Sequence, residues 1–515
     1  MKIIFTLIFL AFGLVASAAT YYVATNGNNS NPGTIDLPWA SWQKGFSTLL
    51  PGDILYIRGG NYTIMYGTGH GVSISNRDGS AGNLITVLNY PGEKPELDCS
   101  SLSVSAGVNY GISMRYCDYW HVKGLTVKNV REYNNLHKSV AGSAPTSAWE
   151  LSDCTNVTLE LCVVTGCAEG FTLNNVLYNI HYLNCDAYNN WDYYDNGGLT
   201  NGFGGHCDGA STIVYTGCRA WANSDDGWDN MAGAGYMTYY NCWAYRNGYD
   251  TPTRGNGDGF KLGMDASKTE LPGSQRTLYN CISAENWLMG FDESMNAVTS
   301  MDMELYNCVA YKNNRDYGFR FKELTGTGVT TLRNNISYFN NVNYQGRARN
   351  ISDHNTWDVG APLVSNSDFV NIDPSQLIRP RKADGSLPDI EFMHLATTSD
   401  LINAGVDVGR PFSGSAPDLG AFETIVNSVS EGFDKSTISI YPNPASNYVD
   451  ISKLENNVGV QSVKIYDMTG ALVSETILNP DINNRIPLNF KPGLFILQVK
   501  VGSEIISVQK LVVVE

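Results

Sequence analysis

The stretch NCWAYRNG, residues 241–248, recurs in altered form through the middle of the chain. Its counterparts are LCVVTGC, NCDAYNN, GCRAWANS, NCISAENW and NCVAYKNN, in which strand-forming residues follow a Cys. The aligned cysteines are residues 162, 185, 218, 242, 281 and 308, so the interval varies from 23 residues (162 to 185) to 39 residues (242 to 281). A short repeat with variable insertions is typical of a solenoid.

The repeated units contain strand formers punctuated by Asn and Gly, and they lack a sustained helical period. We therefore predict an all-β fold, a right-handed parallel β-helix of about ten coils, each adding roughly 4.8 Å along the axis. The aligned cysteines are expected to form a buried stack of free thiols rather than disulfides. The Asn residues are expected to form a ladder in a turn, because Asn tolerates left-handed backbone.

A second column repeats as Gly, an aromatic residue and a variable residue. Neighbours in a strand point to opposite faces, so aromatic residues that stack inside place the variable residues outside. This outer row mixes charges of both signs, which is typical of a site rather than of a structural face. It is expected to contain Thr172, Gly204, Asp229, Lys261, Asp292 and Arg320.

The beginning of the chain, MKIIFTLIFLAFGLVASAA, has a Lys, a short apolar run and small residues. This pattern predicts a secretory signal peptide over residues 1–18, because the apolar run is too short for a membrane span. No later stretch is long and apolar enough to cross a bilayer. The net charge of −16 excludes binding of nucleic acid by bulk attraction. We expect an exported monomer.

The remaining chain divides into a β-helix domain over residues 19–423, a linker over 424–435 and a small β-sandwich over 436–515. Residues 350–423 are expected to fold back on the helix. The sandwich resembles the C-terminal sorting domain of type IX secretion in the stretches YPNPASN, KIYDMTG and QKLVVVE. That resemblance implies contact with the secretion machinery and a secreted or cell-surface protein. A carbohydrate-binding sandwich is the alternative.

Three carboxylates lie within WANSDDGWDNM, residues 221–231: Asp225, Asp226 and Asp229. Like charges this close repel unless a cation lies between them. Asp208 lies about one coil earlier, and four hard oxygen ligands favour Ca²⁺. The alternative is an ordinary turn, because Asp-Asp-Gly is also a common turn sequence.

Lys261 is predicted to follow Asp229 by one coil, because DGFK, residues 258–261, aligns with DGWD, residues 226–229. A nearby cation lowers the pKa of a lysine, which can then act as a general base. Beside Ca²⁺, such a base would remove the C5 proton of a uronic acid and start a β-elimination. Arg320 and Lys322 would hold neighbouring substrate carboxylates.

The stretches HCDGAS, NSDDGWDNM and DGFKLG resemble polysaccharide lyase family nine, a family of right-handed parallel β-helix enzymes, chiefly pectate lyases. By motif position the resemblance implies that Asp208, Asp225, Asp226 and Asp229 are calcium ligands and that Lys261 is the catalytic base. We expect a calcium-dependent lyase of pectic homogalacturonan, an acidic plant-type polysaccharide. The alternatives are a rhamnogalacturonan lyase with the same mechanism, a β-helix glycoside hydrolase, or an adhesive solenoid held by calcium.

Overall fold

The computed structural model describes residues 18–64, 70–102, 109–131, 146–191, 197–209, 211–230, 234–249, 254–263, 274–294, 301–319, 328–339, 342–344, 350–424, 439–441, 443, 445–452, 461–467, 472–478, 485–501 and 504–513. They form two compact units. The first runs to Gly405 and includes Leu419–Phe422, and the second contains Val406–Asp418 and the chain from Glu423. The predicted signal peptide, apart from Ala18, and all but the first residue of the predicted linker lie outside the described residues.

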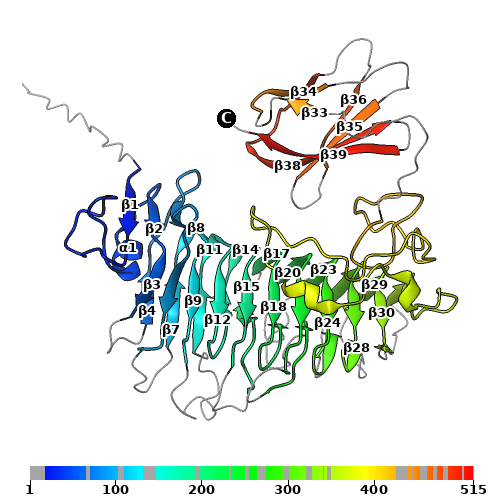
Figure 1. Cartoon of the computed structure of the whole chain (residues 1–515), viewed down its shortest axis with the longest axis horizontal. Helices are drawn as coiled ribbons and strands as arrows, with labels where there is room; N and C mark the ends of the chain where they lie inside the picture. The colour runs from blue at the N-terminus through cyan, green and yellow to red at the C-terminus, as the bar shows by residue number, and fades with distance from the viewer. Residues whose placement is uncertain are drawn as a thin grey trace, which may run out of the picture. The chain divides into compact units, whose positions relative to one another are not determined.

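Three parallel sheets run the length of the first unit, and successive coils add strands to each of them in turn (Figure 1). The first sheet contains, in spatial order, β1 (Thr20–Val23), β2 (Ile54–Ile57), β5 (Ile85–Asn89), β8 (Asp118–Lys123), β11 (Thr155–Glu160), β14 (Tyr178–Leu183), β17 (Thr212–Thr216), β20 (Tyr236–Tyr240), β23 (Gln275–Tyr279), β26 (Asp302–Tyr306), β29 (Thr330–Arg333) and β32 (Ile351–Asp353). The second contains β3 (Gly60–Thr63), β6 (Pro95–Asp98), β9 (Thr126–Lys128), β12 (Val163–Thr165), β15 (Asp186–Tyr188), β18 (Arg219–Trp221), β21 (Trp243–Tyr245), β24 (Ile282–Ala284), β27 (Val309–Tyr311) and β30 (Ile336–Tyr338). The third contains β4 (His70–Ser75), β7 (Tyr110–Arg115), β10 (Ser147–Ser152), β13 (Phe171–Val176), β16 (Phe203–Asp208), β19 (Trp228–Asp229), β22 (Phe260–Lys261), β25 (Met289–Asp292), β28 (Arg315–Phe319) and β31 (Val342–Tyr344).

The repeated Asn before Cys forms the turn between the first and second sheets. The residue at this position has a positive φ, +54° in Asn184, +53° in Asn241 and +61° in Gly217. Asn and Gly tolerate this left-handed conformation better than other residues. The chain therefore changes direction within one residue, and the next side chain, the Cys, points into the core.

All eleven cysteines are buried free thiols, including the six aligned cysteines for which the sequence predicted this. Along the repeat, a thiol donates a weak hydrogen bond to a carbonyl of the preceding coil, for example Cys185 to Leu159 at 3.2 Å and Cys218 to Tyr182 at 3.3 Å. Small thiols therefore fill the tight space at this turn without cross-linking the coils.

The predicted Asn ladder lies at the turn between the second and third sheets. Each buried amide except the last donates to the Asn side-chain oxygen of the next coil, at distances of 2.8 to 3.0 Å. The members are Asn190, Asn223, Asn247, Asn286 and Asn313. The ladder satisfies polar groups that a buried turn would otherwise leave unpaired.

The predicted aromatic column stacks inside the third sheet, with Phe203, Trp228, Phe260 and Phe291 at centroid separations of 4.5 to 5.1 Å. The column continues with Tyr317 rather than with Phe319, because Phe291 pairs with Tyr317 in the strand register. The predicted triplet Gly318-Phe319-Arg320 was therefore wrong by two residues. Such a shift keeps the inward and outward parity of a strand, so the sequence pattern could not exclude it.

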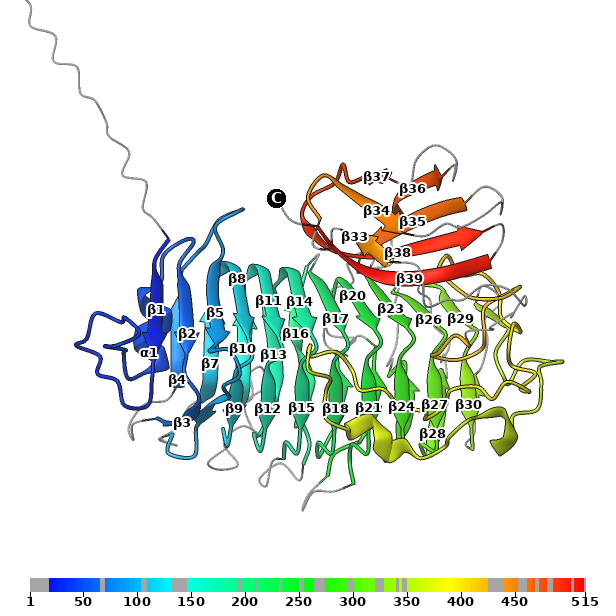
Figure 2. The same ribbon diagram turned by 45° about the horizontal axis from the view of Figure 1, so that its top comes forward.

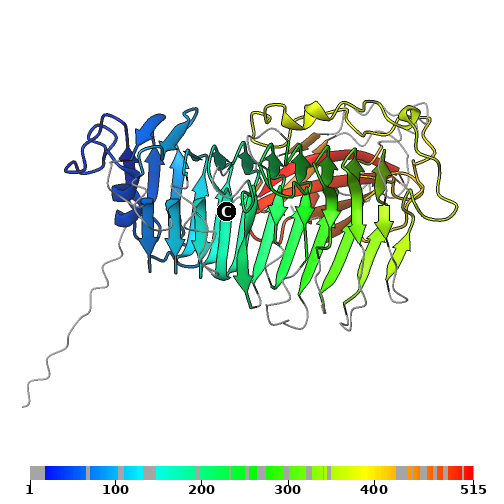
Figure 3. The same cartoon turned by 90° about the horizontal axis from the view of Figure 1, so that it is seen from below.

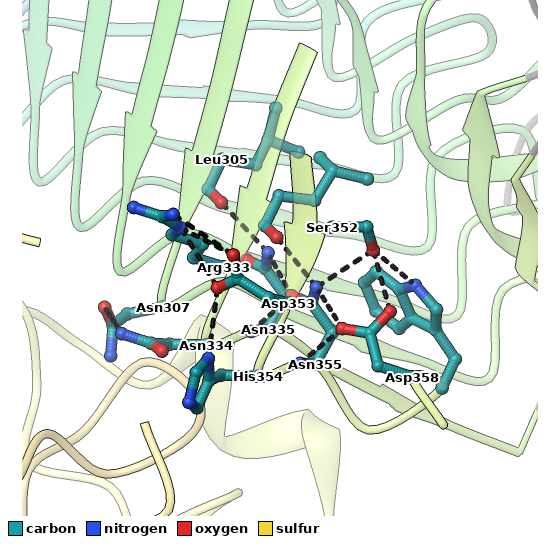
Figure 4. A network of polar contacts seen from close by, with 12 residues as sticks. Leu305, Asn307, Arg333, Asn334, Asn335, Ser352, Asp353, His354, Asn355 and Asp358 are labelled. Carbon is teal, nitrogen blue, oxygen red and sulfur yellow. Dashed lines mark hydrogen bonds and ion pairs between the residues drawn. The ribbon is translucent and has the colours of Figure 1, made fainter. Parts of the chain in front are cut away.

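Both ends of the stack are covered. Helix α1 (Trp42–Thr48) packs at the N-terminal end, where Trp42 and Phe46 join the core (Figure 1). At the other end, Asn335 donates to Asn355 at 2.8 Å, and Asn355 donates to Asp358 at 2.8 Å (Figure 4). A solenoid needs such ends, because its last coils have no neighbour to bury them.

The segment between β32 and Gly405 lies along the second sheet (Figure 2) together with Leu419–Phe422, as the sequence predicted, whereas Val406–Asp418 and Glu423 group with the second unit. It contains two short 3₁₀ helices, η2 (Asn366–Asp368) and η3 (Pro374–Ile378). Asp186 of β15 fastens it through an ion pair to Arg381 at 2.6 Å. Arg219 of β18, which pairs with Asp186 at 2.8 Å, also donates to the carbonyls of Leu377 and Arg379 in this segment. Burial opposes the charge of Asp186, yet the two arginines lower its pKa. Seen from below, the stacked coils follow one another in chain order (Figure 3).

The second unit holds two antiparallel sheets. One contains β33 (Ser439–Tyr441), β34 (Tyr448–Ser452) and β37 (Arg485–Pro487), and the other contains β36 (Leu472–Leu478), β35 (Gln461–Asp467), β38 (Gly493–Val501) and β39 (Glu504–Val513). Their buried residues include Val449, Val463, Leu497 and Leu511. This is the predicted small β-sandwich. Among the described residues no helix has the length and hydropathy of a membrane span.

Candidate active site

The outer row of the third sheet brings the predicted site residues into register. Gly204 of β16 pairs with Asp229 of β19, Asp229 pairs with Lys261 of β22, and Lys261 pairs with Asp292 of β25. The next partner in the row is Gly318, which pairs with Asp292. Paired residues in adjacent parallel strands are about 4.8 Å apart, so Asp229 and Lys261 are direct neighbours.

Lys261 is the centre of a buried charge cluster. Its ammonium donates to Asp229 Oδ2 at 3.1 Å and to Asp226 Oδ2 at 3.2 Å, and only 7% of the residue is exposed. Burial by itself lowers the pKa of Lys261, but the charges of Asp226, Asp229, Asp225 and Asp258 outweigh it and raise the pKa. The carboxylates alone thus hold Lys261 as an ammonium. The lowered pKa that a general base requires has to come from an additional positive charge.

Backbone N–H groups orient the two adjacent aspartates. Asp225 accepts from Asn256 at 2.6 Å and from Leu199 at 2.9 Å. Asp226 is fully buried and accepts from the N–H of Asp258 at 2.6 Å through Oδ1, while its Oδ2 faces Lys261. Burial raises the pKa of both aspartates, and the neighbouring carboxylates add to the rise.

A second row lies one residue before the repeated Gly of the coils, and it was not recognised as a row in the sequence. Asn201 accepts from the N–H of Asp226 at 3.2 Å, Asp226 from that of Asp258, and Asp258 from that of Met289 at 2.8 Å. The signal was present, since an Asn or Asp precedes Gly202, Gly227 and Gly259. In Asp226, one carboxylate oxygen thus supports the next coil, and the other contacts Lys261 of the outer row.

Asp258 has an unusual electrostatic position. It is 1% exposed, and burial together with the charge of Asp292 raises its pKa to about 8. Lys261 acts in the opposite direction. Asp258 therefore binds a proton in part of the pH range in which an exposed Asp is ionised.

The donor chemistry fits a hard divalent cation, because Asp226 and Asp229 direct carboxylates toward the ammonium of Lys261 and the carboxylate of Asp225 interacts electrostatically with the same ammonium. Within the described ranges, however, no three acidic, His or Cys side chains already form a metal cage. The Lys261 ammonium is the cation that the carboxylates share.

The structure does not bring Asp208 to this cluster. Asp208 ends β16 opposite Val176, four residues past Gly204, which is about 13 Å along a strand. The alternation of inward and outward residues predicted Asp208 on the outer side of the sheet. It does not predict how far Asp208 lies from Gly204 along the strand. Arg320 and Lys322 lie outside the described residues.

Comparisons with known proteins agree with the fold. The sequence model for the Pel9A-like right-handed β-helix region matches residues 21–355, and the model for the secretion system C-terminal sorting domain matches residues 439–514. Pectate lyase L of Dickeya chrysanthemi is 34% identical over 425 residues, which cover 79% of this chain and 91% of that protein.

Two solved structures are similar over most of the first unit. The crystal structure of pectate lyase Pel9A has a TM-score of 0.65 and 32% identity, with 79% of this chain and 97% of that chain covered. A rhamnogalacturonan lyase has a TM-score of 0.62 and 26% identity, with 74% and 97% covered. The predicted right-handed parallel β-helix and C-terminal sorting domain are confirmed.

Proposed function

The chain belongs to the Pel9A-like right-handed β-helix family, and from that premise we propose that it is a calcium-dependent lyase that cleaves pectic homogalacturonan by β-elimination. Its relatives support a polysaccharide lyase; the polymer, the ion and the base are the proposal. The observation that carries it is the pairing of Lys261 with Asp226 and Asp229 on adjacent coils.

Lys261 is the proposed base. In its neutral form it would take the C5 proton of a galacturonate unit. The electrons of the C5–H bond then form the C4–C5 double bond, and the bond between C4 and the linking oxygen breaks. The oxygen leaves with its electron pair, and the new chain end is an unsaturated uronate.

Asp225, Asp226 and Asp229 are the proposed calcium-holding residues. A bound Ca²⁺ would supply positive charge that offsets the substrate carboxylate and lowers the pKa of Lys261. Asp208 was the fourth ligand expected from the sequence, and we leave it out of the set because of its position at the far end of β16. The amide oxygen of Asn201, which already contacts Asp226, lies in the neighbouring coil.

The sorting domain at residues 439–514 makes this a protein exported to the cell surface or beyond. We propose that residues 1–18 are removed as a signal peptide, that residues 19–423 form the lyase domain and that residues 424–435 link it to the sorting domain at 436–515. We also propose that the protein is a monomer, because one chain supplies Lys261 and all three aspartates.

The second candidate function is that of a rhamnogalacturonan lyase. A solved structure of a protein with that name has the same fold and is 26% identical in sequence to this chain. The deciding experiment measures ultraviolet absorbance of the unsaturated product on polygalacturonate and on rhamnogalacturonan, with Ca²⁺ or with a chelator. We expect absorbance to rise on polygalacturonate with Ca²⁺ and to stay flat with the chelator. Product on rhamnogalacturonan alone would favour the second candidate, and chelator-resistant product would contradict the role of calcium.

A further inference from the structure

Trp287 is a rigidly held aromatic residue close to the charge cluster. It directly follows Asn286, a member of the Asn ladder, and its backbone N–H donates to the carbonyl oxygen of Asn247 at 3.0 Å. A Cβ atom added at Gly248 or at Gly257 would lie 2.7 Å from the Cβ of Trp287, so only glycine fits at either position. Both glycines also have positive φ. Two backbone segments therefore clamp the base of the indole.

Arg254 lies over this indole. Its guanidinium carbon is 3.7 Å from the ring centroid, and the residue is exposed. No described acidic residue forms an ion pair with Arg254. Tyr249, which is 43% exposed, packs edge-on against the indole at 5.2 Å. The aromatic ring thus orients the guanidinium while its N–H groups remain available to a ligand.

The same short segment connects Arg254 to the charge cluster. Asn256, two residues after Arg254, donates its N–H to Asp225 at 2.6 Å. Between them, Gly255 lies so close that an added Cβ would be 2.2 Å from Asp225 Oδ1. The same segment continues into strand β22, which ends at Lys261. The backbone that positions Arg254 is therefore the backbone that contacts a proposed calcium ligand.

The negative charge of the protein favours a role for Arg254 in binding an acidic substrate. The chain carries a net charge of −16, and a polyanionic substrate has to approach a cluster of aspartates. The nearby Arg246 already faces Glu285 at 3.6 Å, and Lys261 is bound to two aspartates. Arg254 is the exposed cation of this region whose charge no described carboxylate offsets.

We propose that Arg254 forms a subsite for the carboxylate of a uronate unit beside the one that is cleaved, and that Trp287 is the positioning residue that holds its guanidinium. The inference rests on the proposed function for the identity of the polymer. A guanidinium binds a carboxylate through two parallel hydrogen bonds, which a methyl ester cannot accept with the same strength. Arg254 therefore favours unesterified pectin.

The test compares Arg254→Gln with Arg246→Gln, a matched change of a neighbouring arginine that already faces Glu285. On polygalacturonate, Arg254→Gln is expected to raise KM roughly tenfold, the usual effect of losing a hydrogen bond to a charged group, and to leave kcat within about threefold. Arg246→Gln is expected to change KM less than twofold. Trp287→Leu should raise KM by an intermediate factor, and the effect of Arg254→Gln should shrink on highly methyl-esterified pectin.

Binding separates this inference from the proposed function. The dissociation constant of trigalacturonate, measured by calorimetry, should rise in Arg254→Gln but not in Arg246→Gln, whether or not any polymer is cleaved. A wild-type protein that binds trigalacturonate through Arg254 but makes no unsaturated product would overturn the lyase and leave the subsite. Unchanged KM and unchanged trigalacturonate affinity in Arg254→Gln, with an unaltered melting curve, would overturn the subsite.

Discussion

Lys261 and a divalent cation would bind the same carboxylates, so the two positive charges would compete for them. Asp226 and Asp229 accept from the ammonium at 3.2 and 3.1 Å. In the buried environment these charges stabilise the protonated amine and raise its pKa. A cation on the same carboxylates would weaken that stabilisation and repel the ammonium proton. The reactive form of Lys261 and the occupied metal site would therefore arise together.

Asp258 gives a prediction for stability. Its pKa of about 8 lies above the value of about 3.9 expected in the unfolded chain, so the folded state binds this proton more tightly. The stability that the proton confers is complete below pH 4 and is lost as the pH rises toward 8. In chelator, Asp258→Asn should therefore raise the free energy of unfolding at pH 8.5, by about 2–5 kcal/mol, and change it little at pH 4.

Denaturant unfolding of the two proteins at several pH values measures this effect. Asp407→Asn, a change of an exposed aspartate in the second unit, serves as the control. Equal stability of Asp258→Asn and wild type at pH 8.5 would show that Asp258 is ionised without cost in the folded protein.

At the level of the elements, the turns define the coil. The positive φ of Asn241 and its counterparts reverses the chain before a buried thiol, and the Asn ladder reverses it again before the third sheet. The third-sheet strands that carry the site are short, with two residues each in β19 and β22. Their register is therefore fixed mainly by the turns that precede them.

Asn247 tests the contribution of the ladder. It is fully buried, and it bonds with Asn223 at 3.0 Å and with Asn286 at 2.8 Å. Asn247→Ala removes the oxygen that accepts from the backbone N–H and the amide of Asn223, and it removes the amide that donates to Asn286, which should lower the free energy of unfolding by about 2–4 kcal/mol. The control is Asn26→Ala at an exposed position. Similar melting curves for the two variants would contradict a stabilising ladder.

The coil could be predicted from the sequence for two reasons. Its turns repeat a recognisable residue pair, such as Asn241-Cys242, and the aromatic residues keep the same inward position in successive coils. The pairing of Asp229 with Lys261 could be predicted for the same reasons. Distances along a strand carry no such pattern, so Asp208 was placed too close. The shift to Tyr317 was missed because a displacement by two residues leaves the alternation of faces unchanged.

At the level of the whole molecule, the two units have separate cores and separate tasks. The first buries the thiols and the aromatic column, and the second has its own core around Val463 and Leu497. Residues 439–514 match a sorting domain, whereas the proposed chemistry lies entirely between Asp225 and Lys261. Catalysis and export should therefore be separable.

Deletion of residues 425–515 tests this separation. The shortened chain should keep the melting temperature of the first unit within about 3 °C, because its hydrophobic core is untouched. Its kcat/KM on polygalacturonate should stay within about twofold, while export in a host with the matching secretion system should be lost. Loss of lyase activity in a folded shortened chain would show that the sorting domain contributes to the site.

Lys261→Ala provides the most direct test of the central claim, that one amine and one carboxylate-bound cation act as a pair. With saturating Ca²⁺ and polygalacturonate, we expect the rate of ultraviolet product formation to fall by about 10²–10⁴ as a result of losing the general base. Calorimetry on the same protein should show that Ca²⁺ still binds, because Asp225, Asp226 and Asp229 are unchanged and no ammonium competes for them. Turnover at the wild-type rate with Ca²⁺ bound would contradict the account.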